Sequence, residues 1–484
     1  MSWLSTALWV LPAAAAVLVG LAPAKLWGRS AFAIAAMLAN LVLALIAIGQ
    51  FDSSKGLQFA ESREWVSDLG LTYHVGIDGL SLVMVALTAF CVPLATAFGL
   101  WAKRENLRGY LALMLALEAA VVLLFVARDL IVFYVGFEAM LVPLIFLIGG
   151  WGGTRRVRAT IRFVVYTLVG SLLLLVSVIT LGLSNGTFDL DGISANTSPW
   201  LFLAMIAAFA IKSPLFPFHG WVPEAYREAP PEVAGLLSGV ISKAGTYGMI
   251  RFALPIFQEP SSDWRWLFVT LALAGLLWCS LMAFRQPDSR GVIAYSSIAQ
   301  MSLITLGLFV GSGEAYTGSV FQMVNHGLLS MLLFLLAGFV EVRFGETAFA
   351  RIGSLARGRA ALATIVMATG MAALAVPGSS LFASEFLVLL GAFRYWWLVG
   401  AIASLAIVLA AMYMLRWISA VLHDRTATPV REGKDVRWEA LYLVPLLAVV
   451  GFLSVDPHAV TARVDCDSHA GLVAPASTGS EICR

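Results

Sequence analysis

Charged side chains are scarce in this sequence. Asp, Glu, Lys and Arg together make up 12% of the 484 residues, whereas 60% are hydrophobic. So few charges cannot cover the surface of a soluble globule of this length, which excludes that class of protein. Apolar windows of about 20 residues, the length that crosses about 30 Å of hydrocarbon, follow one another almost end to end. The composition therefore predicts a polytopic membrane protein.

Cysteine is also scarce, and the four residues show no CxxC spacing and no Cys/His cluster. Cys91 and Cys279 fall in apolar segments, whereas Cys466 and Cys483 lie in a polar tail and could pair only in an oxidising compartment. The sequence has no glycine-rich nucleotide motif, nucleophile elbow or metal-ligand spacing. We therefore expect no redox cofactor and no metal on this chain.

The apolar windows predict an all-α fold of about fourteen transmembrane helices. We place these helices at residues 3–23, 30–50, 79–101, 108–127, 129–150, 160–184, 199–221, 231–257, 264–284, 290–311, 315–342, 360–391, 396–421 and 438–455. Alternate loops are rich in Lys and Arg, and the intervening loops are poor in them. By the positive-inside rule this alternation puts both termini outside and requires an even number of helices.

Two of the predicted spans contain internal breaks. Pro214 and Pro217 follow Lys212 in the seventh span and remove backbone donors, so this helix must open near the middle of the membrane. The twelfth span is too long for one straight crossing and contains the sequence PGSS from Pro377, shortly before Glu385. Such a pair favours two inverted five-helix repeats, at about 108–257 and 264–421. These repeats lie in one membrane domain, residues 1–458, followed by a polar tail, 459–484.

Ionisable residues inside the predicted spans are the candidates for function, because a charge in hydrocarbon is costly. For any one of them, the alternative is a structural hydrogen bond or salt bridge between helices. As a set on different helices, they favour a path for protons. The set is Glu118, Glu138, Lys212, Lys243, His326 and Glu385.

Glu138 has no basic residue within a helical turn or two, so its partner must come from another helix. Lys212 is the candidate. A carboxylate and an ammonium that face each other in a low dielectric keep each other charged, and their separation favours release of the lysine proton. The two residues would then act as a proton switch, with Lys243 as the next carrier and Glu385 nearest the outer exit.

The remaining candidates have weaker signals. His326 could relay between Lys243 and Glu385, or could equally be a packed, hydrogen-bonded helix histidine. His219 follows a broken helix and is better interpreted as a loop histidine that faces bulk water. Glu118 could collect protons or pair with a neighbouring subunit.

Six motifs resemble a known family, the antiporter-like proton-translocating subunits of respiratory complex I. The motifs are FEAMLVP around Glu138, KSPLFPFHGWVPEA from Lys212, GVISKAGTYGMIRF around Lys243, VIAYSSIAQM from Val292, NHGLLSMLLFLLAG around His326, and VPGSSLFASEFL around Glu385. LTYHVGIDGLSL, from Leu71, is similar to the N-terminal signature of that family, and the resemblance covers about residues 70–420. Glu385 is typical of M-type subunits, because L-type and N-type subunits usually have lysine there.

The resemblance implies a proton-translocating subunit of a bacterial cell membrane, with Glu138 and Lys212 as the coupling pair. It implies L-like and N-like subunits as partners. NADH oxidation and quinone reduction would occur in partner subunits, which would hold the FMN, the iron–sulfur clusters and the quinone. An Mrp-type cation/proton antiporter subunit, a membrane subunit of an energy-converting hydrogenase and a non-pumping assembly scaffold are the alternatives.

The sequence departs from the family pattern at three places. Glu224 and Tyr226 occur in the loop that usually reads Pro-Asp-Ala-His. The segment Asp288–Gly291 replaces the usual Asp-x-Lys-Arg, and Gln300 replaces the usual histidine after AYSS. These departures concern the predicted cytoplasmic coupling region rather than the predicted carriers.

Overall fold

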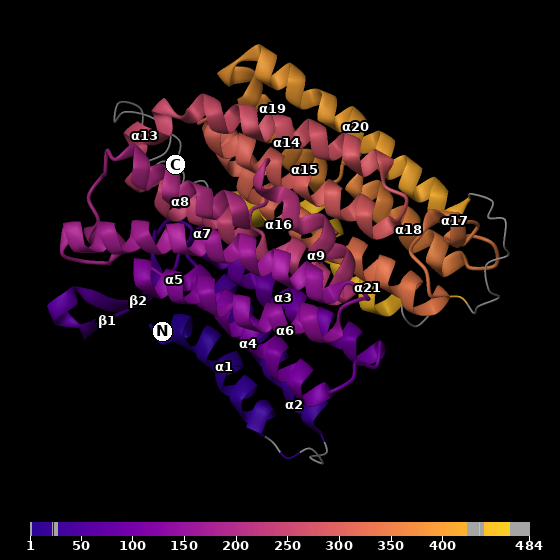
Figure 1. The fold of residues 1–484 in the computed structure, drawn as a ribbon, viewed down its shortest axis with the longest axis horizontal. Helices are drawn as coiled ribbons and strands as arrows, with labels where there is room; N and C mark the ends of the chain where they lie inside the picture. The colour runs from indigo at the N-terminus through magenta and orange to yellow at the C-terminus, as the bar shows by residue number, and fades with distance from the viewer. Residues whose placement is uncertain (1, 22, 24–27, 424–434, 436–439, 465–484) are drawn as a thin grey trace. The chain divides into compact units, whose positions relative to one another are not determined.

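The computed structural model describes residues 2–21, 23, 28–423, 435 and 440–464. Cys466, Cys483 and most of the predicted tail lie outside the described residues. The described chain is mostly helical (Figure 1). It divides into two compact units. Of the described residues, the first unit contains those within 1–213, 240–265 and 462–464, and the second contains those within 214–239 and 266–461.

The first unit begins with two long helices and a hairpin, and continues through a series of apolar helices. Its elements are α1 (Leu4–Leu21), α2 (Arg29–Gln50), β1 (Gln58–Val66), β2 (Leu71–Ile77), α3 (Gly79–Trp101), α4 (Leu107–Val126), α5 (Leu130–Ala139), α6 (Leu141–Trp151), α7 (Arg156–Asn185), α8 (Pro199–Lys212), α11 (Lys243–Gly248), α12 (Leu254–Ile256) and α13 (Gln258–Asp263). Helix α4 packs against α1, α2, α3, α5 and α6, which makes it central to this unit.

The second unit is built around the 32-residue helix α16, most of whose residues are buried. Its elements are α9 (Val222–Glu228), α10 (Pro231–Leu236), α14 (Arg265–Arg285), α15 (Ser289–Phe309), α16 (Gly313–Phe344), α17 (Phe349–Ile352), α18 (Ala360–Ala373), α19 (Ser380–Tyr395), α20 (Trp397–Leu422) and α21 (Ala440–Val455), followed by α22 (His458–Val464). Helices α10, α15, α18, α19 and α21 all pack against α16.

Both predicted helix breaks are present. Helix α8 ends at Lys212, because Pro214 disfavours helical geometry at Ser213 and cannot donate a backbone hydrogen bond. A short 3₁₀ turn, Phe218–Trp221, follows before α9. The predicted span 360–391 is divided into α18 and α19, and the sequence PGSS lies in and beside the gap between them.

Several predicted spans are not single helices long enough to cross a membrane. In the described residues, ten helices are long and apolar enough to cross a membrane, or eleven if the bent pair at the end of α21 is one span. Helices α8 and α18 are apolar but shorter, with 14 residues each. They are the helices of the two broken spans, where the prolines shorten each helical segment below the length of a full crossing.

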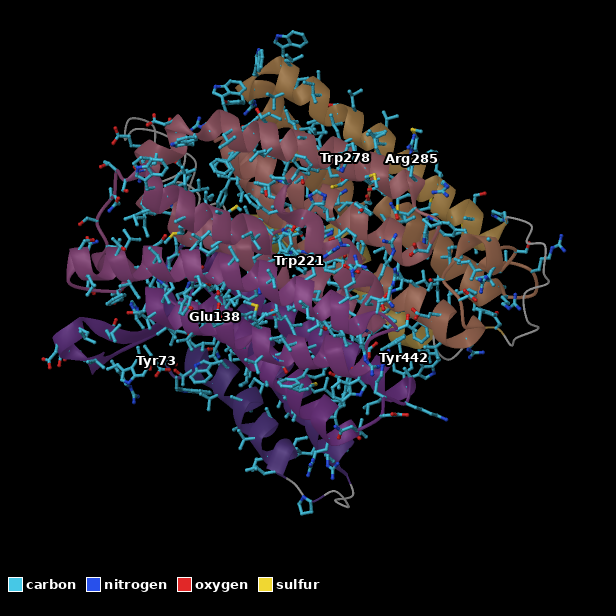
Figure 2. All side chains as sticks on the ribbon, in the orientation of Figure 1. Tyr73, Glu138, Trp221, Trp278, Arg285 and Tyr442 are labelled. Carbon is cyan, nitrogen blue, oxygen red and sulfur yellow. The ribbon has the colours of Figure 1, made fainter. Side chains whose placement is uncertain are left out.

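A β-hairpin departs from the predicted all-α fold. Strands β1 and β2 pair antiparallel between α2 and α3. Tyr73 of β2, labelled in Figure 2, anchors the hairpin to α1: its hydroxyl lies 2.9 Å from Trp9 Nε1 and 2.8 Å from Thr6 Oγ1. Sequence analysis did not find the hairpin, because its charged β1 strand matches a polar loop by composition.

The predicted span 231–257 is not a regular α-helix. Two π-helical segments, Leu237–Ile241 and Met249–Ala253, flank α11. A π-turn adds a residue to the helical turn and is frequent at functional sites. Here the two segments bracket the helix that begins with Lys243.

Candidate functional site

Lys212 is the last residue of α8 and is 2% exposed. Its Nζ lies 5.0 Å from the centroid of the Phe137 ring and 5.9 Å from that of Phe163. The helix C-terminus and the two ring faces each favour a cation at this position. The helix end and the two rings would therefore stabilise a protonated Lys212 in addition to any carboxylate nearby.

Glu138, labelled in Figure 2, lies on α5 and is half-buried. Its charge interacts with that of Lys212. The two side chains make no direct ion pair within 4.0 Å among the contacts of the described residues. Glu138 and Lys212 therefore lie near enough to interact electrostatically, but they form no direct ion pair. Glu138 is also less buried than the sequence predicts.

Lys243 is fully buried at the start of α11, with its Nζ 3.4 Å from Ser242 Oγ. Helix α11 packs tightly against the end of α8. A Cβ at Gly245 would lie 2.5 Å from the backbone oxygen of Phe209 and 2.7 Å from the backbone nitrogen of Ser213. Only glycine allows this approach, which places the helix of Lys243 against the helix end that carries Lys212.

Glu385 lies on α19 in the second unit and is 5% exposed. Gln300 Nε2 donates to Glu385 Oε1 over 2.9 Å, and Gln322 Nε2 donates to Gln300 Oε1 over 2.6 Å. Ser384 Oγ donates to Gln322 Oε1, and Asn325 Nδ2 donates to Ser384 Oγ over 3.1 Å. A chain of buried side chains from α15, α16 and α19 thus orients the carboxyl group.

A small cavity adjoins Glu385. Gln300, Ser280 and Tyr413 contribute its polar lining, and apolar side chains of α14, α15, α19 and α20 complete it. The Tyr413 hydroxyl accepts a hydrogen bond of 2.9 Å from Ser296. The carboxyl of Glu385 therefore has a small, mostly apolar cavity with a few polar groups on one side and the amide chain on the other.

The two candidate histidines differ in their surroundings. His326 is buried on α16, next to Asn325 of the amide chain. His219 is half-buried in the 3₁₀ turn after α8 and stacks on Phe216, with ring centroids 5.4 Å apart. His219 therefore lies in a turn between helices, as predicted, but it is half-buried, and its exposure to bulk water stays a prediction.

Glu118 is completely buried on α4 and accepts a hydrogen bond of 2.8 Å from Asn40 of α2. Its carboxyl group is thus held between two helices of the first unit. Sequence analysis identified the glutamate but not Asn40, because a lone asparagine in an apolar segment gave no indication of its partner.

Sequence analysis also missed a charged cluster at the start of α3. Asp78 caps α3 by accepting from Ser81 N at 2.9 Å, and its carboxylate pairs with Arg251 and, over 3.5 Å, with Arg128. Arg128 also pairs with Asp191 over 2.9 Å. Arg251 lies within the predicted span 231–257 and could have been identified from the sequence as a further intramembrane charge.

Electrostatics favour the ionised form of Asp78. Burial alone would raise its pKa, but the guanidiniums of Arg251 and Arg128 and the Ser81 N–H outweigh burial and hold the pKa below the ordinary value of 3.8. The cluster therefore stabilises the junction of β2, α3 and the residues around Arg251.

A second cluster lies in the second unit, where the sequence departs from the family pattern. Arg290 is 5% exposed and donates to the backbone oxygens of Tyr226, over 2.9 Å, and Ala229, and it pairs with Glu341 over 3.3 Å. Arg227 pairs with Asp288 over 3.0 Å. These contacts tie α9 and the following turn to the N-terminus of α15.

Comparison with known proteins identifies the class to which this arrangement belongs. The family model for the membrane domain of NADH:quinone oxidoreductases and Mrp antiporters matches residues 127–410, more than half of the chain. The chain belongs to this family. The matched region contains Glu138, Lys212, Lys243, His326 and Glu385.

Within this family, the relatives of the chain include subunits M of bacterial NADH-quinone oxidoreductases. The chain is 37% identical to NADH-quinone oxidoreductase subunit M of Mycobacterium tuberculosis, in an alignment that covers 95% of this chain and 92% of that protein. It is 35% identical to subunit M of Rhodobacter capsulatus, with 93% and 92% covered. The resemblance inferred from the motifs is confirmed.

Solved structures share the fold. A chain in the structure of respiratory complex I from Thermus thermophilus with bound NADH is 30% identical, with a TM-score of 0.85 and 96% of this chain and 99% of that chain covered. A chain of the Mrp complex from a Dietzia species has a TM-score of 0.86 at 22% identity, with 97% of each chain covered. The second match shows a common fold only.

Proposed function

We propose that this chain is an M-type proton-translocating membrane subunit of an NADH-quinone oxidoreductase and that Glu138, Lys212, Lys243 and Glu385 carry the protons. The observation that supports the relay most directly is the packing of α11 on the end of α8. It places two buried lysines at the facing ends of neighbouring helices. A proton that leaves Lys212 would thus find a second buried amine on the neighbouring helix, which is the basis of the proposed transfer.

In this scheme Glu138 controls the first step. While its carboxylate interacts with Lys212, the ammonium is stabilised. When that interaction weakens, Lys212 passes its proton on toward Lys243. The absence of a direct ion pair among the described contacts suits this role, because a switch must not be locked in one state. His326 is the proposed relay to Glu385, and the cavity beside Glu385 is the proposed beginning of the exit.

The remaining elements of the scheme concern topology and partners. We propose fourteen spans with two inverted repeats, both termini outside, and location in a bacterial cell membrane. The L-like and N-like antiporter subunits would flank this chain, and the redox reactions would occur on FMN, iron–sulfur clusters and quinone in other subunits. The driving force would reach this chain through contacts along the membrane arm.

An Mrp-type antiporter subunit is the main alternative, because the fold is common to both classes. Purification of the complex through a tag on this chain distinguishes them. Under the proposed function, iron–sulfur subunits and NADH-quinone activity co-purify with the chain. Recovery of a complex without iron, with sodium-dependent proton exchange in vesicles, would support the antiporter alternative, and bound nickel would support the hydrogenase.

A further inference from the structure

Helix α2 carries one polar side chain on its buried face. The residues of α2 that are buried are Ala33, Met37, Asn40, Ala44 and Ala47, whereas Leu38, Val42 and Leu45 on other faces are exposed. Asn40 is completely buried, as is its partner Glu118 on α4. An amide and a carboxyl group are thus enclosed together between two apolar helices.

The single hydrogen bond between these groups leaves two atoms without a donor. Asn40 Nδ2 donates to Glu118 Oε1 over 2.8 Å. Among the described residues, Glu118 Oε2 and Asn40 Oδ1 have no hydrogen-bond partner. Both are acceptors if Glu118 is ionised. A buried acceptor without a donor is destabilising, and a buried carboxylate without one is more so.

Within the described part of the chain, no charged group compensates an ionised Glu118. The ionisable groups on α4 and on the helices and strand that pack against it are Arg29, Tyr73, His74, Cys91, Arg108, Tyr110, Tyr134, Glu138, Lys243 and Tyr247. None of these groups interacts electrostatically with Glu118, for which burial and the Asn40 hydrogen bond are the determinants. An uncompensated buried carboxylate is strongly destabilising, so such a group takes up a proton instead.

We propose that Asn40 and Glu118 form a proton-binding site in which the Glu118 carboxyl group is protonated and donates through Oε2 to Asn40 Oδ1. The proton converts Oε2 from an acceptor into a donor, so one proton satisfies both unpartnered atoms. The amide and the acid then exchange two hydrogen bonds in place of one. Asn40 is a positioning residue in this site, because it holds the proton on the carboxyl group.

Two other arrangements are compatible with the same contact and are separated by experiment. A purely structural hydrogen bond would leave Glu118 ionised. A monovalent cation such as Na⁺ would bind between Glu118 Oε2 and Asn40 Oδ1, since both are oxygen ligands. The proton-binding site requires a neutral carboxyl group at neutral pH, whatever the Na⁺ concentration.

Infrared difference spectroscopy of the whole purified complex tests the site. The wild type minus Glu118→Gln spectrum at neutral pH is expected to show the carbonyl stretching band of a protonated carboxylic acid, which shifts downward in D₂O. Glutamine is isosteric and can replace both hydrogen bonds, so this variant is expected to assemble. Absence of the band would overturn the proposal, because it means that Glu118 is ionised.

Asn40→Leu tests the role of the amide. Loss of the amide, which donates to the Glu118 carbonyl oxygen and accepts from its hydroxyl, is expected to move the Glu118 band to higher frequency, and an unmoved band would contradict the acid–amide pair. If Asn40→Leu does not assemble, Asn40→Ala serves the same purpose. Disappearance of the band in a high-Na⁺ buffer would show a cation site and overturn the proton-binding site. None of these measurements depends on proton pumping, so the relay and this site can fail separately.

Discussion

Gln300 donates a hydrogen bond of 2.9 Å to Glu385, and its own carbonyl oxygen accepts one of 2.6 Å from Gln322. This relationship fixes the orientation of the Gln300 amide, because the carbonyl end is held by one partner and the amino end by the other. Glu385 is therefore held by a group that cannot itself release a proton at neutral pH. We interpret Gln300 as a positioning residue that replaces the histidine usual in the family.

Gln300→Leu is expected to reduce proton movement and lower the thermal stability of the complex. The substitution removes the donor to Glu385 and the acceptor of Gln322, and each buried group left unpaired costs about 1–3 kcal/mol. Measurement of proton pumping in vesicles and of Tm tests this prediction. Gln300→His, which retains a donor, is the control and is expected to keep most of the activity. Equal activity of Gln300→Leu and the wild type would exclude the positioning role.

Gly245→Ala is expected to separate α11 from the end of α8. The added methyl would lie within 3 Å of backbone atoms of Phe209 and Ser213, which cannot move aside as a flexible side chain does. Overpacking of this kind costs about 1–3 kcal/mol. A lower Tm and reduced pumping are the expected results. Gly150→Ala is the matched control, because a Cβ at Gly150 meets no atom within 4 Å.

Asp78→Asn is expected to destabilise the protein at neutral pH by about 3 kcal/mol, because the buried ion pairs of Asp78 with Arg251 and Arg128 are then lost. The pKa of Asp78 is lowered in the folded state, so its contribution is present above pH 3.8 and is lost as the pH falls below that value. The difference in Tm between wild type and variant should therefore shrink in acid. A difference that stays constant or grows with acidity would contradict the assigned ion pairs.

Lys212→Ala and Glu138→Gln are expected to reduce quinone-coupled proton movement by more than about tenfold while the complex remains assembled, because each variant removes one member of the proposed switch. Blue-native electrophoresis checks assembly, and a pH-sensitive dye in vesicles measures pumping. Normal pumping in both variants would exclude the switch.

The sequence predicted those features of the fold that depend on local composition. Hydropathy located most of the long helices, and the prolines at 214 and 377 located both helix breaks. The β1–β2 hairpin and the π-helical segments around Lys243 were not predicted. Charged strand residues resemble a loop, and a π-turn depends on how a helix packs on its neighbours rather than on its own residues.

The candidate site shows the same division. An ionisable side chain inside an apolar segment is easy to recognise in a sequence, because burying its charge costs free energy. This criterion identified Glu118, Lys212, Lys243 and Glu385. Their partners were not identified. Asn40 and Gln300 are ordinary polar residues whose roles depend on side chains 78 and 85 positions away in the chain. Such pairs are defined by helix packing alone.

The central claim is that protons pass through buried lysines of this chain, and Lys243→Met tests it most directly. The variant complex is reconstituted in vesicles, and the ratio of protons moved to electrons transferred is measured with NADH and quinone. Methionine fills the same space without a proton, so we expect the ratio to fall below that of the wild type. A wild-type ratio in an assembled Lys243→Met complex would contradict the role of Lys243 as a carrier.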